Sequence, residues 1–371
     1  MNQSNQTRSG RVMWCVGAAA LLLALLFCAA LLSIRAIRTD LSGMDAAERW
    51  QAEDSPHPFA QLAVYFDSAS SVSLNTVYLN RMEITKTLEE NAITPAEGAS
   101  VFIDAFSGET ALSVTTDRAT IYVNATACGG DFFFFHPLEL LHGDYFAEDD
   151  LTARSVILDE YAAWQLFGAT EVSGMDVTIG GQPFRVSGVC KKPEGELESA
   201  TWGEVPRIFV NYLGLRMTNN FDRASVYEIV LPNPIDNFAM DLLRTQLSVR
   251  ENSTSADAYN ITERFDFEVL AGQTGDFFMR SVRIDRILPP FWENNIRVAE
   301  SKAIIIAFFG SAAGILALIA AVGFVSLWFI RHPIRIAGIY GFFEDKYEAR
   351  RMKKWLKKQN SPLNAPEKPR S

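Results

Sequence analysis

Two long apolar runs, one near each end, constrain this chain more than any other feature of its sequence. The first extends from Val12 to Ile34 without a charged residue, and the second extends from Ala303 to Ile330. At roughly 1.5 Å per helical residue, each run is long enough to cross the roughly 30 Å hydrocarbon core of a bilayer. The sequence therefore predicts transmembrane helices at residues 12–34 and 301–330. A cleaved signal peptide is the alternative for the first run, but its apolar part exceeds the usual length of about 7–15 residues.

The distribution of charge predicts how the chain is oriented. Residues 331–371 carry 11 Lys and Arg against 4 Asp and Glu, and two arginines precede the first run. Because the whole chain has a net charge of −10, the segment between the runs is strongly acidic. Basic residues that flank a span stay in the cytoplasm, and acidic domains are exported freely. We therefore expect residues 1–11 and the basic tail to be cytoplasmic and residues 35–300 to form an extracytoplasmic domain. The tail also suits contact with anionic lipid headgroups.

The segment between the runs mixes strands and helices without regular alternation. Its strongest local signal is the pair Gly180-Gly181 between two alternating strands, which predicts a hairpin over residues 175–192. This pattern favours an α+β domain with two mixed α/β subdomains over a doubly wound parallel sheet. The other expected strands are residues 59–67, 100–108, 120–130, 155–158, 206–212 and 226–234, with a strand pair in 255–272. The expected helices are residues 42–54, 74–91, 159–168 and 236–252.

The stretch "GGDFFFFHPLELLHGDYF", residues 129–146, combines four consecutive phenylalanines with two of the four histidines. If the phenylalanines form a strand, Phe132 and Phe134 face one side and Phe133 and Phe135 the other. Such a strand is buried between layers or packs against a subunit. The histidines do not indicate a metal site, because zinc needs three or four ligands and no obvious third one lies nearby.

The sequence lacks the common signatures of catalysis. It contains no P-loop, no G-x-S-x-G, no H-E-x-x-H and no C-x-x-C pattern, so we expect neither an enzyme nor a bound cofactor or metal. The net negative charge of the exported segment indicates a solvated surface and not a nucleic-acid interface. Cys128 and Cys190 lie in this segment, where a disulfide is chemically permitted, although two buried free thiols fit equally well.

The order of motifs after residue 129 resembles the periplasmic core domain of MacB-type ABC transporter permeases, in the wider FtsX-like group. The stretches that carry the resemblance are "LELLHGDYF" (138–146), "SVILDEYAAWQLFG" (155–168) and "VTIGGQPFRVSGV" (177–189). They match about 60 residues closely, and Asp144 departs from the basic residue that is common in the family. The resemblance implies structural roles for Gly143, Phe146, Asp150, Leu166, Phe167, Gly168, Gly174, Phe184, Gly188 and Val189.

The resemblance continues beyond the second run. The stretch "RHPIRIAGIYGFFEDKYEARR" (331–351) is similar to the family's basic helix that docks on a nucleotide-binding subunit. A basic helix facing lipid is the alternative. The family's transmembrane unit has four spans, so the resemblance implies further spans from a second permease-type chain or from another copy. Gly310 and Gly314 place two small residues on one face of the second run, and this lets helices approach closely. The residues that match positions of the family's docking helix are Arg335, Ile336, Gly338, Ile339 and Gly341.

The family's fold and layout imply a function. We expect a non-catalytic membrane subunit of a MacB/FtsX-like ABC transporter in a bacterial plasma membrane, which passes motion from a separate ATPase to the exported domain. The alternatives are a two-span extracytoplasmic sensor and a membrane-anchored binding or scaffold protein. The short tail, without long heptads, speaks against an output domain of the sensor kind.

Overall fold

The computed structural model describes residues 3–41, 43–51, 55–94, 100–146, 150, 152–250, 255–276, 289–331 and 346–355. The chain divides into two compact units, Cys28–Ser311 and a second unit made of Met1–Phe27 with Ala312–Ser371. Among the described residues, two helices are long and apolar enough to cross a membrane, in agreement with the two predicted transmembrane helices. They are α1 (Gln3–Thr39) and α11 (Phe291–Arg331), and α11 begins well before the predicted span at 301.

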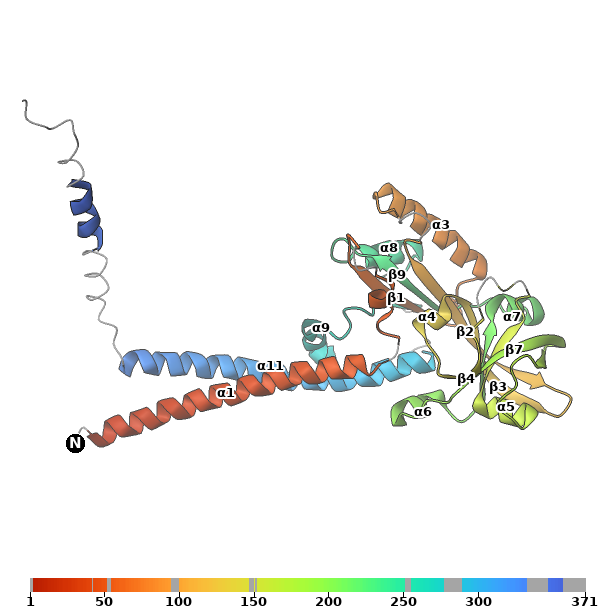
Figure 1. The fold of residues 1–371 in the computed structure, drawn as a ribbon, viewed down its shortest axis with the longest axis horizontal. Coiled ribbons are helices and arrows are strands. Elements are labelled where there is room, and N and C mark those ends of the chain that lie inside the picture. The colour runs from red at the N-terminus through yellow and green to blue at the C-terminus, as the bar shows by residue number, and fades with distance from the viewer. Residues whose placement is uncertain are drawn as a thin grey trace, which may run out of the picture. The chain divides into compact units, whose positions relative to one another are not determined.

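The unit Cys28–Ser311 is built on one sheet that has ten strands within the described ranges (Figure 1). The strand order is β10-β1-β9-β2-β3-β8-β5-β7-β4, and β6 pairs with β2 and β7. The pairings of β3 with β8 and of β5 with β7 are parallel, and the others are antiparallel. The predicted mixed α/β class is therefore confirmed. The strands that were expected in two subdomains share one sheet. The strands are β1 (Phe59–Phe66), β2 (Ile103–Thr115), β3 (Thr120–Gly130), β4 (Leu140–Gly143), β5 (Ser155–Asp159), β6 (Asp176–Ile179), β7 (Gln182–Cys190), β8 (Arg207–Asn211), β9 (Val226–Pro232) and β10 (Ala256–Asn260).

Helices cover both faces of the sheet, which explains why its central strands are apolar on both sides. In β1, Leu62 and Val64 join one core cluster while Ala63 and Tyr65 join the other. The first cluster includes side chains from α3 (Leu74–Glu90), α5 (Glu160–Phe167), α7 (Tyr212–Asn219) and α8 (Phe238–Gln246). The second includes side chains from α2 (Ala46–Trp50), α4 (Phe132–Phe135), α6 (Glu196–Trp202), α9 (Phe267–Gly272), the end of α1 and the beginning of α11.

Local signals for the turn between β6 and β7 and for the helix α5 are confirmed. Gly180 and Gly181 both have positive φ and join β6 to β7, as a tight hairpin turn requires. Asp159 caps the beginning of α5 by accepting a hydrogen bond of 2.6 Å from the backbone N–H of Ala162. Gly168 ends the helix in the left-handed conformation with φ of 75°.

The prediction of a strand at Phe132–Phe135 is wrong, because these residues form the one-turn helix α4. Gly130 has φ of 64° and ends β3, and the N–H of His136 bonds the carbonyl of Phe132 at 2.9 Å. A helical turn places Phe132 and Phe135 together in the second core cluster. The other two phenylalanines are half-buried against this chain's own residues: Phe133 stacks on Tyr145 and Phe134 meets the edge of Trp50.

Two other expectations need correction. In residues 255–272 only β10 is a strand; the second predicted strand is the helix α9. Residues 261–265 form a turn between them. Within the described residues, the helix predicted at 42–54 corresponds to α2, which is shorter than predicted.

Cys128 and Cys190 are buried free thiols, so the disulfide alternative is wrong. Cys128 lies in β3 and Cys190 in β7, with β8 and β5 between them in the sheet. Three strand spacings separate the two residues by at least about 14 Å, far beyond the Cα separation that a disulfide bridges. Burial raises the pKa of both thiols, which keeps them protonated and unreactive.

Candidate functional site

The first three turns of α11 lie against the second core cluster, ahead of the apolar run. Trp292, Ile296, Ala299 and Ala303 are buried and follow one another at spacings of three and four residues. This spacing places them on one face of the helix. The segment that leads into the predicted span is therefore packed against the exported domain before the apolar run begins.

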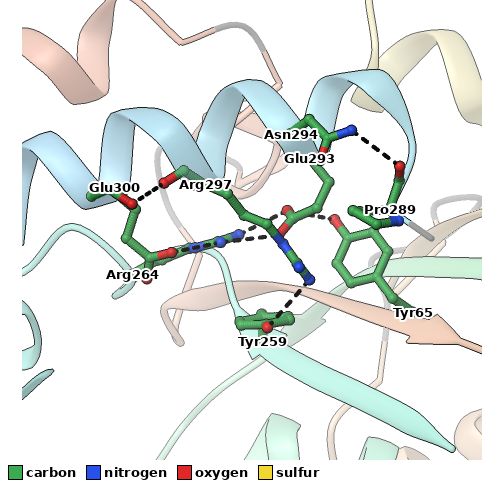
Figure 2. A network of polar contacts seen from close by, with 9 residues as sticks. Tyr65, Tyr259, Arg264, Pro289, Glu293, Asn294, Arg297 and Glu300 are labelled. Carbon is green, nitrogen blue, oxygen red and sulfur yellow. Dashed lines mark hydrogen bonds and ion pairs between the residues drawn. The ribbon is translucent and has the colours of Figure 1, made fainter. Parts of the chain in front are cut away.

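A buried ion-pair network fixes this segment to the turn after β10 (Figure 2). The guanidinium of Arg264 donates to both carboxylate oxygens of Glu293, at 2.8 and 3.0 Å. It also donates to Glu300 at 2.8 Å. Glu293 and Glu300 lie seven residues apart, so they occupy the same face of the helix two turns from each other. One arginine thus binds two turns of α11 at once.

The network extends to the edge of the sheet. Arg297 donates to Glu293 at 2.8 Å, and the hydroxyl of Tyr65 in β1 donates to Glu293 at 3.0 Å. The guanidinium of Arg264 lies 4.6 Å from the ring centre of Tyr259 in β10, a cation–π contact. Strands β1 and β10 therefore both contribute to the attachment of α11.

The ion pairs of the network keep the carboxylate of Glu293 ionised. Glu293 is fully buried, and burial alone would raise its pKa. Ion pairing with Arg264, followed by Arg297, outweighs burial and holds the pKa of Glu293 below its ordinary value. Burial works against the charge of Arg264 as well, yet Glu293 and Glu300 hold the pKa of this guanidinium well above its ordinary value. Two arginines balance two glutamates, so the charge is compensated where solvent is excluded.

Aromatic contacts hold the first turn of α11. The ring centre of Trp292 lies 4.4 Å from that of His136 and 5.6 Å from that of Phe132 in α4. His136 in turn contacts Glu228 of β9 at 2.5 Å. Phe291 packs edge-on against Trp202 of α6 at 4.8 Å. The phenylalanine stretch and His136 therefore form part of the surface against which the first turn of α11 packs.

The end of α1 is attached to the same face of the sheet. The side-chain amide of Gln61 in β1 donates to the carbonyl of Gly43 at 2.6 Å, and its oxygen accepts from the N–H of Ala46. Within the same unit, a Cβ on Gly310 of α11 would come 2.9 Å from the Cβ of Ala30 in α1. Close approach of the two helices therefore favours a small residue at 310. In the other unit, a Cβ on Gly314 would come 3.2 Å from Phe27.

The residues to which the resemblance assigns structural roles are not part of the ion-pair network. Gly143 has φ of 79°, and a Cβ there would clash with the carbonyl oxygen of Ser187. Phe146 packs edge-on against Phe133, and Asp150 accepts a hydrogen bond from the N–H of Thr152. The others lie on and after α5, in the turn before β6 or on β7: Leu166, Phe167, Gly168, Gly174, Phe184, Gly188 and Val189.

The predicted ATPase-docking residues Arg335, Ile336, Gly338, Ile339 and Gly341 lie outside the described residues. The network residues were not predicted from the sequence. A signal was present, because Glu293, Arg297 and Glu300 alternate in charge at helical spacing between buried apolar positions just before the apolar run. Within the described ranges, no group of three or more His, Cys, Asp and Glu side chains is placed to hold a metal ion.

Comparison with known proteins gives three kinds of match. The sequence profile of the MacB-like periplasmic core domain matches residues 49–258. The macrolide export ATP-binding/permease protein MacB of Agrobacterium fabrum (strain C58 / ATCC 33970) is 34% identical over 137 residues, which cover 34% of this chain and 21% of that protein. The match thus spans about a fifth of the relative's length.

Two solved structures are also similar. The periplasmic region of MacB from Actinobacillus actinomycetemcomitans has 14% identity and a TM-score of 0.39, covering 54% of this chain and 89% of that one. The extracellular domain of the ABC-type transporter YknZ from Gram-positive bacteria has 16% identity and a TM-score of 0.37, covering 54% of this chain and all of that one.

Proposed function

Because this chain belongs to the MacB-like periplasmic core domain family, we propose that it is a non-catalytic membrane subunit that transmits motion in a MacB/FtsX-like ABC transporter. A separate subunit supplies ATP hydrolysis, and the helices α1 and α11 act as levers on the exported domain. Its partners in this proposal are the ATPase subunit and a second permease-type chain or another copy of this one.

The ion-pair network of α11 supports this proposal most strongly. A lever transmits movement only if it does not slip against the part that it moves. Arg264 binds Glu293 and Glu300, two turns apart on α11, so sliding of α11 past the turn after β10 would break two buried ion pairs. Breaking a buried pair costs about 3–5 kcal/mol, because a charge is left without a partner away from water. Movement of α11 is therefore passed to the whole sheet.

The charge pattern supports the orientation. The basic tail 331–371 lies on the cytoplasmic side, where an ATPase subunit is found, and the acidic domain lies outside. In this arrangement Arg335 and its neighbours contact the ATPase subunit, and the spans contact the lipid bilayer in the plasma membrane.

Affinity purification of the full-length protein from its native membranes in mild detergent tests the partner. We expect mass spectrometry to identify an ABC ATPase subunit together with a permease-type membrane chain, or a multimer of this chain. Recovery of the intact protein with neither an ATPase nor a second membrane subunit would contradict the proposal.

A charge-reversal pair tests the contact with the ATPase. We expect Arg335→Glu to reduce the amount of ATPase recovered, because Arg335 is in step with the family's docking helix. The matched control is Arg370→Glu, which makes the same change of charge near the end of the same tail and leaves recovery unchanged. Equal losses in the two variants would indicate a general effect of tail charge.

A further inference from the structure

A groove of about 1050 Å³ lies in the unit Cys28–Ser311 where α1 meets the exported domain. It is lined by the last part of α1, the segment that leads into α2, α2 itself, residues 265–267 and Pro137. The size is at the upper end of the range for small-molecule sites.

The lining of the groove changes where the apolar run ends. Leu31 and Ile34 belong to the last turn of the run 12–34, and Arg35 follows directly, with Arg38 one turn further on. Phe267, which is half-buried, adds apolar surface to the lining. In the orientation proposed above, this change places the groove at the boundary between hydrocarbon and headgroups of the outer leaflet, where arginine side chains reach lipid phosphates. An occupant that matches both levels has an apolar part and a polar part.

Most charges in the groove are already paired with each other. Arg38 binds Glu48 at 2.9 Å, and Arg49 binds Asp45 at 3.0 Å. Arg49 also donates to the carbonyl of Phe134. These pairs leave no need for a ligand at those positions.

Three exposed charges remain in the lining: Arg35, Asp40 and Asp266. None of them forms an ion pair with another of the described residues. Asp266 directly precedes α9, yet its side chain makes no capping hydrogen bond. The groove therefore offers one cation and two carboxylates that form no ion pair, and Arg38 is near enough to Asp266 to act on its charge.

We propose that this groove binds a phospholipid of the extracytoplasmic leaflet that has a phosphoethanolamine headgroup. The phosphate bonds the guanidinium of Arg35, a strong charge-assisted interaction. The ammonium group donates hydrogen bonds to Asp40 and Asp266, and the acyl chains lie along Leu31 and Ile34. The proposal rests on the orientation proposed above, goes beyond the proposed transport function and does not depend on an ATPase subunit.

The charges also distinguish this headgroup from other common ones. Phosphatidylglycerol carries a net negative charge and offers no cation to the two carboxylates, so it leaves both of them unpaired. Phosphatidylcholine is zwitterionic, but its quaternary ammonium has no N–H to donate. A primary amine next to a phosphate satisfies all three charged side chains.

Native mass spectrometry of the full-length protein in detergent, titrated with each lipid, tests the proposal. We expect phosphatidylethanolamine to bind at least about tenfold more tightly than phosphatidylglycerol or phosphatidylcholine, the effect of one or more hydrogen bonds to a charged group. Arg35→Ala and the milder Arg35→Gln should each weaken phosphatidylethanolamine binding about tenfold or more. Comparable binding of the three lipids, or unchanged binding by both variants, would overturn the proposal.

Three controls complete the experiment. Lys302 is exposed and directly precedes the apolar run of α11, outside the groove, so Lys302→Ala should leave binding unchanged. An equal loss in this variant would indicate general interfacial attraction and overturn the site. The double variant Asp40→Asn/Asp266→Asn should lose the preference for phosphatidylethanolamine over phosphatidylcholine; a retained preference would contradict the placement of the amine. Water-soluble glycerophosphoethanolamine should not compete, and full competition would show that the acyl chains contribute nothing.

Discussion

Arg264 and Glu293 form a bidentate ion pair, with distances of 2.8 and 3.0 Å, at a position where neither side chain is appreciably exposed. Arg264 belongs to the turn after β10, and Glu293 to the first turn of a helix that continues into an apolar run long enough to cross a membrane. The pair therefore connects the exported domain directly to the lever in the proposed mechanism.

Removing the guanidinium should destabilise the domain strongly. We expect Arg264→Met to lower the free energy of unfolding by about 3–5 kcal/mol, because Glu293 and Glu300 lose their shared partner inside the protein. The control is Arg185→Met, which removes an exposed ion pair with Asp176 and should cost at most about 1 kcal/mol. Tryptophan fluorescence during denaturant unfolding of the full-length protein in detergent measures both. Similar values for the two variants would contradict the importance of the network.

The same pair makes stability depend on pH. The pKa of Glu293 is lower in the folded protein than its ordinary value of 4.5. A lowered pKa means that Glu293 contributes stability above that ordinary value, and that this contribution disappears as the pH falls through the folded value. We expect Glu293→Gln to be less stable than the wild type at pH 7 and to lose less stability on acidification below about pH 4.5. Denaturant titrations at a series of pH values give the free energy of unfolding of both proteins as a function of pH. Equal slopes of this dependence in the wild type and in Glu293→Gln would exclude this role.

Gly143 should tolerate substitution less well than Gly174, although both have positive φ. A Cβ on Gly143 would clash with the carbonyl oxygen of Ser187, whereas a Cβ on Gly174 meets nothing within 4 Å. We expect Gly174→Ala to cost about 1–2 kcal/mol for its conformation alone, and Gly143→Ala to cost clearly more. Thermal unfolding of the two variants side by side tests this difference, and equal losses would show that β4 shifts to make room.

The two cysteines of the exported domain should behave as buried thiols. We expect Cys128 and Cys190 to resist a water-soluble thiol reagent in the folded protein and to react fully after unfolding without a reductant. Intact-protein mass spectrometry counts the labels. Labelling of the two residues only after reduction would indicate a disulfide and contradict the strand order between them.

The sequence predicted the parts of the fold that depend on local signals. The pair Gly180-Gly181 and the cap at Gly168 determine their own turns, so the hairpin and the end of α5 were predicted correctly. Phe132–Phe135 was misread because four consecutive phenylalanines have no period, and the helical turn is chosen by contacts with Trp292 and Phe209, distant in sequence.

The ion-pair network was missed for a related reason. Charged side chains before an apolar run usually lie in water or at the membrane surface, and the sequence contains nothing to show that Glu293 is buried. Its burial follows from the turn that places Arg264 opposite it, which is a tertiary contact between residues 29 positions apart. A pattern of spacing alone predicts the face of the helix but not its partner.

The central claim is that α11 and the exported domain move as one body when an ATPase subunit acts on the helix. Spin labels at Val298→Cys on α11 and Met82→Cys on α3, both exposed positions, report movement between them by electron–electron distance measurement. Cys15 and Cys28 are replaced by serine. A third label at Ile330→Cys, paired with one on the ATPase subunit, reports movement at the other end of the helix.

The measurement compares the purified assembly without nucleotide and trapped with ATP and vanadate. The account predicts that the distance from Ile330 to the ATPase subunit changes while the distance between Val298 and Met82 stays the same. A changed distance between Val298 and Met82, or no change at Ile330, would contradict it.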